Sequence, residues 1–349
     1  MSHASPPEPS PGAILTLSQA YWGACALHAG VALDVFSPLS AGPRTAAELA
    51  GRLSCDERAM GMLLGALVAL GLLRREGTAF ALTAESETFL VRGKPGYVGP
   101  IIRHHRHLLP SFGRLDEAVR TGGRVRGATQ GDEIAREDFL LGMFNMAMGI
   151  APRLAPRLDG LLRAAGLPGV SAGARLLDLG GGPGTYAIHF CLAHADMTAT
   201  LFDLPTTRPF AEATIAGFGL GGGDGPGRIA FHPGDYTADP IHGTFDLAWL
   251  SHILHGESPD MSARIVRKAA GALVSGGVLL IHEFLLDDSL DGPAFPTLFS
   301  LNMLLGTDGG QAYSGAQLRE ILAAAGLVDL CELDFTGPNN TRVVAGRKP

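Results

Sequence analysis

The sequence predicts an α/β protein in which a Rossmann-like sheet, ending in an antiparallel hairpin, follows a mainly helical winged-helix region. Three observations predict this fold class. Strand and helix patterns alternate from about residue 174 onward, and residues 45–83 have the order helix, helix, hairpin. With 46% hydrophobic and 17% charged residues, the 349-residue chain can bury the cores of two domains.

The patterns divide the chain into four segments. They are a Pro- and Ser-rich tail at 1–12, expected to be disordered, the winged-helix domain at 13–103, a helical linker at 104–166 and the Rossmann-like domain at 167–349. In the last segment, strands are expected at 175–179, 199–203, 228–231, 246–250 and 278–282, helices at 186–195, 207–218, 261–273 and 315–325, and the closing hairpin at 329–335 and 341–346.

Capping residues define the helices of the winged-helix region. Thr45 and Glu48 have the spacing of a capping box, in which side chains and backbone satisfy each other at a helix start. Either Ser54 or Asp56 can cap the next helix. Two short strand patterns then flank Gly77, which predicts the hairpin.

A winged helix suggests DNA binding, but the side chains argue against it. A recognition helix needs polar and basic side chains for the major groove, whereas the second helix, at 60–70, is apolar on every face. The formal net charge of -7 also provides no basic footprint for phosphate. We therefore expect this helix to pack in a core or against a second subunit, and we expect no nucleic-acid partner.

The sequence shows neither a membrane span nor a secretion signal. The longest apolar run, at 59–73, is shorter than the about 20 residues needed to cross a bilayer. The N-terminus lacks a basic stretch followed by an apolar one. We therefore expect a cytoplasmic protein with no membrane partner.

Three features at successive strand ends predict a site for S-adenosylmethionine (AdoMet). The turn Gly-Gly-Gly-Pro-Gly at 180–184 lets the backbone turn sharply after the first strand and approach a ligand closely. Its Pro183 stands where a dinucleotide fingerprint leaves room for pyrophosphate. Asp203 ends the second strand, where a carboxylate can accept hydrogen bonds from both ribose hydroxyls, and Asp235 and Tyr236 follow the third strand.

These motifs resemble the class I O-methyltransferase family, which includes plant caffeate and flavonoid enzymes, acetylserotonin methyltransferase, and bacterial polyketide and carotenoid methyltransferases. The similarity covers nearly the whole chain, with a winged-helix dimerisation domain in front. It implies an AdoMet-dependent methyltransferase that forms a homodimer through that domain. It also implies that the cofactor is bound by Gly180, Gly182 and Asp203, is flanked at its adenine by Asp235 and Tyr236, and lies near Ser251, where plant members have Lys.

A histidine and a glutamate at neighbouring strand ends predict the catalytic pair. Transfer of a methyl group to a phenol or enol needs a base, and histidine, with an ordinary pKa of about 6.5, suits this role. Continued past residue 250, the fourth strand ends at His255, at the edge of the sheet where ligands bind in this fold, and Glu283 ends the fifth strand. The resemblance implies that His255 is the general base and that Glu283 orients it.

Three other histidines, His242, His252 and His282, lie near the predicted cleft. His282 precedes Glu283, and the alternation of a strand turns it to the opposite face. His252 lies three residues before His255, but no third metal ligand follows this pair at a recognisable spacing. We therefore expect no metal site.

Two apolar segments supply the expected walls of the acceptor site. Phe144-Asn-Met-Ala-Met148 resembles the family's Phe-Asn-x-x-Met substrate helix, and methionine side chains adapt to flat ligands. In Phe299-Ser-Leu-Asn-Met303, the amide of Asn302 either faces the acceptor or is a satisfied buried group. The residues expected to bind the substrate are Phe144, Asn145, Met148, Phe299, Asn302 and Met303.

We therefore expect methyl transfer to a small, largely apolar metabolite, aromatic or polyketide-like, with a hydroxyl as the acceptor. Two departures from the family pattern leave other chemistry open. Gly256 follows the base where plant members have Asp, and Ala312 stands where the family has its second catalytic Glu. The alternatives are C-, N- or S-methylation, non-methylating chemistry with the same cofactor (hydroxylation, decarboxylation or a pericyclic reaction), and a winged-helix regulator that binds DNA.

Overall fold

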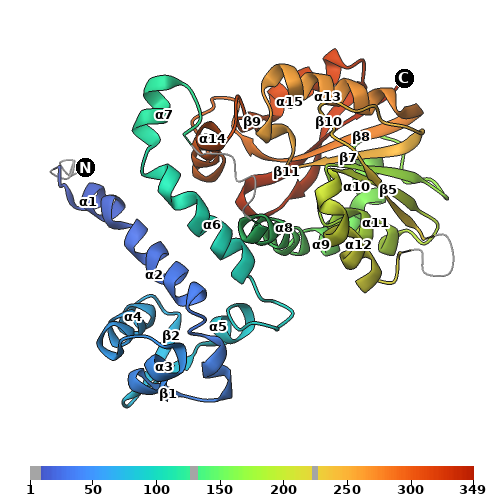
Figure 1. The fold of residues 1–349 in the computed structure, drawn as a ribbon. Coiled ribbons are helices and arrows are strands. Elements are labelled where there is room, and N and C mark those ends of the chain that lie inside the picture. Colours follow the sequence, from blue (N-terminus) through green and yellow to red (C-terminus); the bar gives the residue numbers. More distant parts are fainter. Residues whose placement is uncertain (1–8, 126–132, 222–226) are drawn as a thin grey trace, which may run out of the picture. The chain divides into compact units, whose positions relative to one another are not determined.

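The computed structural model describes residues 9–125, 133–221 and 227–349, and the chain divides into two compact units (Figure 1). The first unit is Met1–His107 and the second is Leu108–Pro349. Residues 1–8 of the expected tail lie outside the described residues, and the first helix begins at Gly12. No helix among the described residues is long and apolar enough to cross a membrane.

The first unit contains the predicted helix, helix and hairpin. Its elements are α1 (Gly12–Gln19), α2 (Tyr21–Ala32), η1 (Ser37–Ala41), β1 (Arg44–Thr45), α3 (Ala46–Leu53), α4 (Glu57–Ala69), β2 (Leu73–Glu76), β3 (Ala79–Leu82), α5 (Ala84–Phe89) and the greater part of α6 (Gly99–Phe112). The three strands form an antiparallel sheet in the order β1-β3-β2. Helices α3 and α4 followed by the β2–β3 hairpin confirm the predicted order.

Side-chain caps set the boundaries of α3 and α4. Thr45 Oγ1 accepts a hydrogen bond from the Glu48 backbone N–H, and Glu48 Oε2 accepts one from the Thr45 N–H, so the capping box of α3 is confirmed. Of the two candidate caps for α4, Asp56 fills the position and accepts from the Ala59 N–H at 2.8 Å. Ser54 instead ends α3 in a left-handed conformation.

Helix α4 packs one face into the core of the first unit and leaves another face open. Met60, Leu64 and Leu67 are buried. Met62 and Leu70 are 59% and 47% exposed. One side of this apolar helix is therefore buried within the chain, as predicted. The exposed apolar side has the character of a surface that packs against another protein.

The second unit alternates strands with helices. Its elements are α7 (Leu115–Thr121), α8 (Glu133–Met148), α9 (Ala151–Leu154), η2 (Ala155–Arg157), α10 (Leu158–Ala164), β4 (Arg175–Leu179), α11 (Thr185–Ala193), β5 (Thr198–Asp203), η3 (Pro205–Thr207), α12 (Arg208–Gly217), β6 (Ile229–Pro233), β7 (Phe245–Ser251), η4 (Leu254–Gly256), α13 (Pro259–Gly271), β8 (Leu273–Leu286), α14 (Ala294–Gly306), β9 (Tyr313–Ser314), α15 (Gly315–Ala324), β10 (Val328–Thr336), η5 (Pro338–Asn340) and β11 (Thr341–Arg347).

One sheet organises the second unit, with helices on both of its faces (Figure 1). Its order is β10-β11-β8-β7-β4-β5-β6, and β9 pairs with the end of β8. The strands from β8 to β6 are parallel, whereas β11 is antiparallel to both β8 and β10. The predicted Rossmann-like sheet with a terminal antiparallel hairpin is therefore confirmed. The buried side chains form a core on each face, one around Phe190 and Trp249, the other around Leu250 and Ile265.

Strand β8 is longer than predicted, and this changes the place of Glu283. The expected strand at 278–282 extends to Leu273 on one side and to Leu286 on the other. The Gly-rich stretch before residue 278 is part of the strand, with Gly276 in a positive-φ conformation at 81°. Glu283 therefore lies inside the strand and not at its end.

Two further elements differ from the prediction. His255 does not lie on strand β7, which ends at Ser251, but in the short 3-10 turn η4. The apolar segment around Phe299 is a helix, α14, for which no helix was predicted. Helix α14 is apolar on most of its surface, so its sequence carries no clear helical period.

Candidate active site

The glycine turn after β4 is shaped for close approach to a ligand. Gly180, Gly182 and Gly184 all have positive φ, at 67°, 54° and 79°. A Cβ atom at Gly180 would lie 2.7 Å from Ile253 Cγ2 and 3.2 Å from the ring of Tyr236. Any side chain here would fill the space above the strand end, so the turn requires glycine for both its conformation and its clearance.

Asp203 ties the glycine turn to the end of β5. Its Oδ2 accepts a hydrogen bond from the Gly182 N–H at 2.8 Å, and its Oδ1 accepts from the Leu204 N–H at 2.7 Å and from Thr207 Oγ1 at 3.0 Å. Burial raises the pKa of this carboxyl, and these hydrogen bonds oppose the rise. The predicted ribose-binding carboxylate is therefore held against the turn, in a position fixed by several donors.

Asp235 and Tyr236 lie beside the same turn. Asp235 Oδ1 accepts from the Thr237 N–H at 2.7 Å and from the Thr237 hydroxyl at 2.6 Å, and the hydroxyl is the largest cause of the lowered pKa of Asp235. The Tyr236 hydroxyl donates to Glu257 Oε1 at 3.3 Å. Glu257 was not predicted as a site residue, and burial raises the pKa of its carboxyl.

His255 and Glu283 form a hydrogen-bonded pair. His255 Nδ1 lies 2.6 Å from Glu283 Oε2. The other carboxylate oxygen, Oε1, accepts from the backbone N–H groups of Leu254 and His255, at 3.1 and 3.3 Å. The turn η4 therefore fixes the carboxylate, and the carboxylate in turn fixes the imidazole. A proton on Nδ1 that is donated to the carboxylate leaves Nε2 with a free lone pair.

The Glu283 carboxyl remains ionised although it is buried. Burial alone would raise its pKa, but the neighbouring His255 and contacts with both His255 and His252 outweigh this effect and hold the pKa well below its usual range. Only 2% of the side chain is exposed. An ionised carboxylate next to an imidazole stabilises the positive charge that the ring acquires when it takes a proton.

His252 also lies against Glu283, which the sequence did not reveal. Its Nδ1 is 3.4 Å from Glu283 Oε2, is buried, and has no hydrogen-bond partner. Its backbone has a positive φ of 57°, and its ring packs on Phe284 and His282 with centroid distances of 4.3 and 4.8 Å. Burial lowers its pKa, so the ring is neutral.

His282 and His242 are the other two histidines that were expected near the cleft. His282 points to the face of β8 opposite Glu283, as strand alternation predicted, and its Nδ1 lies 2.9 Å from the hydroxyl of Ser251. Burial holds the pKa of His282 well below its usual range. Ser251, predicted to lie near the cofactor, ends β7 with its hydroxyl in this contact. His242 is exposed and contacts the ring of His232.

An aromatic wall covers the imidazole of His255. The ring of Phe299 on α14 lies nearly perpendicular to the His255 ring, at a centroid distance of 4.7 Å. Phe284 and Phe295 pack on Phe299, at 5.0 and 6.0 Å. The predicted wall residue Phe299 is thus next to the base.

The other predicted wall residues lie on two helices. Met303 and Asn302 occupy α14 with Phe299, Met303 buried and Asn302 half-buried. Phe144, Asn145 and Met148 are half-buried on α8. Met148 Sδ lies 3.3 Å from His189 Nε2, on α11, so this residue is held by α11 and not by the catalytic pair.

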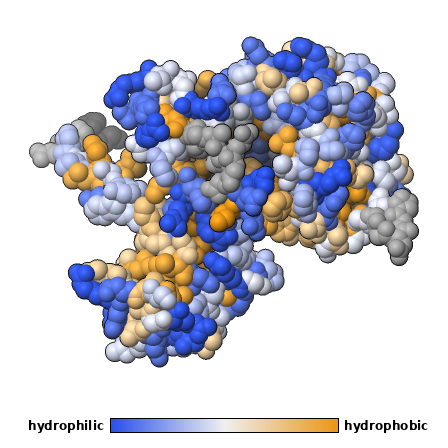
Figure 2. Space-filling model, in the orientation of Figure 1, coloured by the Kyte–Doolittle hydropathy of each residue, from blue (hydrophilic) through white to orange (hydrophobic). Residues whose placement is uncertain are grey.

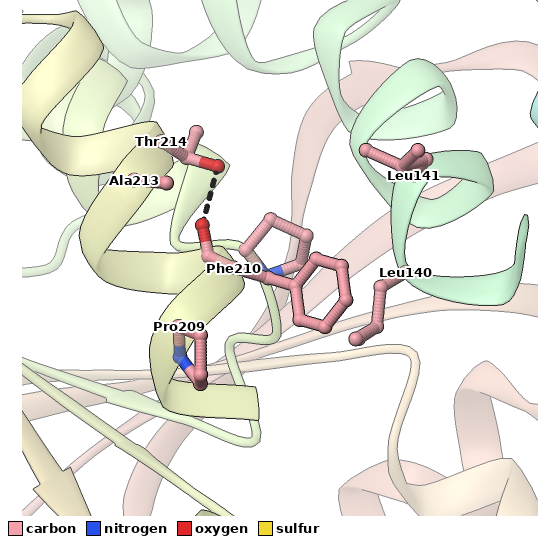
Figure 3. Close-up of a pocket in the computed structure, with 7 residues that line it drawn as sticks. Leu140, Leu141, Pro209, Phe210, Ala213 and Thr214 are labelled. Atoms are coloured by element: carbon pink, nitrogen blue, oxygen red, sulfur yellow. Dashed lines mark hydrogen bonds between the residues drawn. The ribbon is translucent and has the colours of Figure 1, made fainter. Parts of the chain in front are cut away.

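A small cavity adjoins the glycine turn on another side (Figure 3). It has a volume of about 240 Å³ and lies between α8 and α12, with Phe210 facing Leu140 across it. Pro183 of the turn is one of its lining residues. Neither His255 nor Glu283 lines it, so this cavity is separate from the catalytic pair.

The segment that replaces the family's second carboxylate lies against the base. A Cβ atom at Gly310 would lie 2.3 Å from the backbone carbonyl oxygen of His255. Two residues later, Ala312 is buried and its N–H donates to Ser300 Oγ at 2.9 Å. The segment is therefore in place, but Ala312 presents a methyl group and no carboxylate.

A glycine turn, a carboxylate at the next strand end and a terminal antiparallel hairpin on a parallel sheet define a class I AdoMet-dependent methyltransferase. Comparison with protein families matches residues 112–328 to the O-methyltransferase domain and residues 15–92 to the O-methyltransferase dimerisation domain. The chain belongs to this O-methyltransferase family. It is an AdoMet-dependent enzyme, as the sequence predicted.

Individual relatives match over almost the full length. The chain is 34% identical to 3-hydroxy-5-methyl-1-naphthoate 3-O-methyltransferase of Streptomyces sahachiroi, over 99% of this chain and 97% of that protein. It is 33% identical to the tetracenomycin polyketide synthesis 8-O-methyl transferase TcmO of Streptomyces glaucescens, over 97% of both. A solved structure of PigF with SAH has a TM-score of 0.84 and 27% identity, over 97% of this chain and 100% of that one.

Proposed function

We propose that this enzyme transfers the methyl group of AdoMet to a hydroxyl of a small aromatic or polyketide-like acceptor, with His255 as general base and Glu283 as the residue that orients it. The observation that carries the proposal is the 2.6 Å contact of His255 Nδ1 with the buried Glu283 carboxylate. This contact leaves Nε2 as the proton acceptor, on a ring that packs against Phe299.

The chain's residues divide the work of the reaction. AdoMet supplies the methyl group, bound to a positively charged sulfur. The glycine turn and Asp203 position the cofactor at the ends of β4 and β5. His255 Nε2 takes the proton of the acceptor hydroxyl as its oxygen forms the new bond to carbon, and the ionised Glu283 stabilises the resulting imidazolium. The reaction therefore ends with the methyl ether, the demethylated cofactor and a protonated His255.

The acceptor class follows from the walls around the base. Phe299, Phe284 and Phe295 form an apolar, flat-sided surface next to His255. Such a surface suits a fused aromatic ring, whose faces pack well on aromatic side chains. The two Streptomyces relatives are named for methylation of a hydroxynaphthoate and of a tetracenomycin polyketide, which supports an acceptor of the same kind here.

We also propose that the enzyme is a homodimer joined through its first unit. Hydrophobic side chains gather on the surface of α1, which carries orange atoms near the N-terminal end in Figure 2. Leu17 is 77% exposed there, and Trp22 at the start of α2 is 58% exposed. With Ile14 and Leu15, 72% and 55% exposed on α1, these side chains form a group of exposed apolar residues of the kind that marks a protein–protein contact. The match to a dimerisation domain over residues 15–92 supports the same assignment.

Replacement of His255 tests the assignment of the base. In His255→Ala we expect kcat to fall by about 10²–10⁴-fold, the range typical of a general base, while AdoMet affinity stays nearly unchanged. Glu283→Gln should lose less, because it weakens the orientation of the ring without removing it. Rates are measured with methyl-labelled AdoMet and a panel of phenols and enols. A His255→Ala enzyme with the wild-type rate and pH profile would contradict the base assignment.

Ala312 favours a second candidate, chemistry that does not consume the cofactor. Glu283 provides a carboxylate that orients His255. Ala312, at the position of the family's second catalytic carboxylate, is buried and provides none. The same labelled AdoMet separates the two candidates. Label in the product and formation of the demethylated cofactor support transfer, whereas turnover of a substrate with neither supports the second candidate.

A further inference from the structure

His252, His255 and Glu283 bring three metal-binding atoms together. One ring nitrogen of each histidine and one carboxylate oxygen of Glu283 all lie within 4.8 Å of one another. We propose that these residues form a binding site for a divalent metal ion, with Zn²⁺ as the best-fitting occupant, and that the bound ion blocks catalysis. The binding part stands on this geometry, whereas the blocking part rests on the proposed role of His255 as base.

The ligand set and its spacing fit zinc. Two imidazole nitrogens and one carboxylate oxygen are a common zinc set that leaves a fourth position open. Ligands at about 2.0–2.2 Å from a tetrahedral ion lie about 3.3–3.6 Å from one another. His252 Nδ1 and Glu283 Oε2 are 3.4 Å apart. His255 Nδ1 lies 2.6 Å from the same oxygen and must move back by about 0.7–1.0 Å when an ion replaces its proton.

The buried nitrogen of His252 supports the site independently. Its Nδ1 is shielded from water, faces Glu283 and has no hydrogen-bond partner. A buried polar atom without a hydrogen-bond partner destabilises the folded state. A metal ion at this point would satisfy that nitrogen and would share the one carboxylate oxygen on which both rings converge.

The surroundings hold the ligands in place. Glu283 Oε1 is bound by the N–H groups of Leu254 and His255, so that Oε2 is directed toward the two rings. Phe284 packs on His252 at 4.3 Å, and Phe299 packs on His255 at 4.7 Å. Oriented ligands within an apolar shell favour metal binding. The sequence could not reveal the third ligand, because Glu283 follows His255 by 28 residues and reaches it only through the pairing of β8 with β7.

A metal ion at Nδ1 would prevent His255 from acting as a base, because it would change the tautomer of the ring. In the free pair, the ring proton is on Nδ1 and the lone pair of Nε2 is available. With the ion on Nδ1, the neutral ring carries its proton on Nε2, so the proton is moved and none is gained or lost. Nε2 then donates a hydrogen bond and cannot accept the proton of the acceptor hydroxyl. The ion lies on the Glu283 side of the ring, away from Nε2.

Cobalt and zinc titrations of three proteins test the site. The full-length enzyme, freed of metal by EDTA, is compared with His252→Phe, which removes the ligand but keeps an aromatic ring, and with His242→Phe, which removes an exposed histidine outside the trio. We expect wild type and His242→Phe to bind one Co²⁺ per chain with visible absorption bands that Zn²⁺ displaces. His252→Phe should bind Co²⁺ over tenfold more weakly. Loss of a residue that only supports a metal ligand typically costs about 10–100-fold in affinity, and loss of a ligand itself should cost at least as much.

Activity, relative to each protein's own metal-free rate, tests the blocking effect. Zn²⁺ should abolish methyl transfer by wild type and by His242→Phe, EDTA should restore it, and His252→Phe should stay active at the same Zn²⁺ concentration. If His252→Phe does not fold, His252→Asn, which tolerates a left-handed backbone, replaces it. Absence of stoichiometric Co²⁺ binding, or equal binding by the His252 variant, overturns the site. Zn²⁺ bound through His252 with undiminished methyl transfer overturns the blocking step and contradicts His255 as base.

Discussion

Asp203 is the residue that connects the two halves of the proposed cofactor site. One of its oxygens binds the backbone of the glycine turn and the other binds the start of the loop after β5. Its position therefore depends on hydrogen bonds that exist without a ligand, so the site is formed in advance of cofactor binding. The sequence predicted the residue and its place, but not these backbone contacts, which depend on where Gly182 points.

Replacement of Asp203 by Ala should weaken AdoMet binding strongly. It removes the proposed acceptor for the ribose hydroxyls and also frees the Gly182 N–H that orders the turn. Calorimetric titration with AdoMet and with its demethylated product measures the change, and NAD is expected not to bind to wild type. The exposed Asp196 supplies the control variant, Asp196→Ala. Equal affinity of Asp203→Ala and wild type would refute the cofactor role of Asp203.

Asp178, beneath the glycine turn, links stability to pH. Burial raises its pKa to about 7, and the hydrogen bond from the Ala187 N–H at 3.2 Å only partly opposes the rise. The unfolded carboxyl ionises near its ordinary pKa of 3.8. Between these values the native state binds the additional proton, so the contribution of Asp178 to stability falls as pH rises and is constant above about pH 7.

The variant Asp178→Asn should remove this dependence. We expect its free energy of unfolding, relative to wild type, to increase between pH 4 and 7 by up to about 4 kcal/mol and to change little at higher pH. Urea unfolding at several pH values measures the difference. Because other groups titrate equally in both proteins, a difference that is independent of pH would contradict the raised pKa.

An arginine side chain binds the carbonyl groups at the C-terminal end of helix α11, which follows the glycine turn. Arg228 Nη1 donates to the carbonyl oxygens of Cys191, His194 and Ala195, at 2.7, 3.2 and 2.7 Å. The carbonyl groups at a helix C-terminus lack partners within the helix and carry partial negative charge, which a guanidinium neutralises. Arg228 thus fixes the far end of the helix whose beginning forms the cofactor turn.

Loss of this contact should destabilise the protein. Arg228→Ala leaves the part-buried carbonyl groups of Cys191 and His194 without their donor, and hydrogen bonds to charged groups contribute about 1.5–3 kcal/mol. We expect a decrease of this size in the free energy of unfolding, measured in urea, with a smaller decrease for Arg228→Lys. The exposed Arg120, on α7, serves as the matched control. A decrease no larger than that of Arg120→Ala would contradict the capping role.

Helices and strands whose apolar residues recur with a regular period could be predicted from the sequence. Elements whose bounds depend on pairing or packing with other segments could not. The parallel strands and helices α12, α13 and α15 follow their apolar patterns closely, and the beginning of α11 follows from the glycine turn before it. Strand β8 continues beyond its predicted end because β11 and β9 pair with the extra residues. Helix α14, apolar on most sides, carries no period to read. The pair His255–Glu283 could be predicted from strand order, but the approach of His252 depends on a left-handed backbone at one residue.

At the scale of the whole molecule, the exposed apolar surface of the first unit should control assembly. In Leu17→Glu, a charge replaces a side chain that is 77% exposed, so the fold should tolerate it while the proposed interface should not. We expect sedimentation to show a dimer for wild type and a monomer for the variant. Leu192→Glu, at a 48% exposed position on α11, is the control and should remain dimeric. A dimeric Leu17→Glu protein would place the interface elsewhere.

The position of β11 has a consequence for how the enzyme acquires its activity during folding. The strand follows β10 in the chain but inserts between β10 and β8, and Arg342 pairs with Glu283. Until β11 arrives, this edge of β8 is open, and the backbone around Glu283 lacks its pairing strand on that side. A partly folded chain can thus contain the glycine turn and every catalytic side chain and still lack an oriented base. In refolding experiments, AdoMet binding should therefore recover before methyl transfer does.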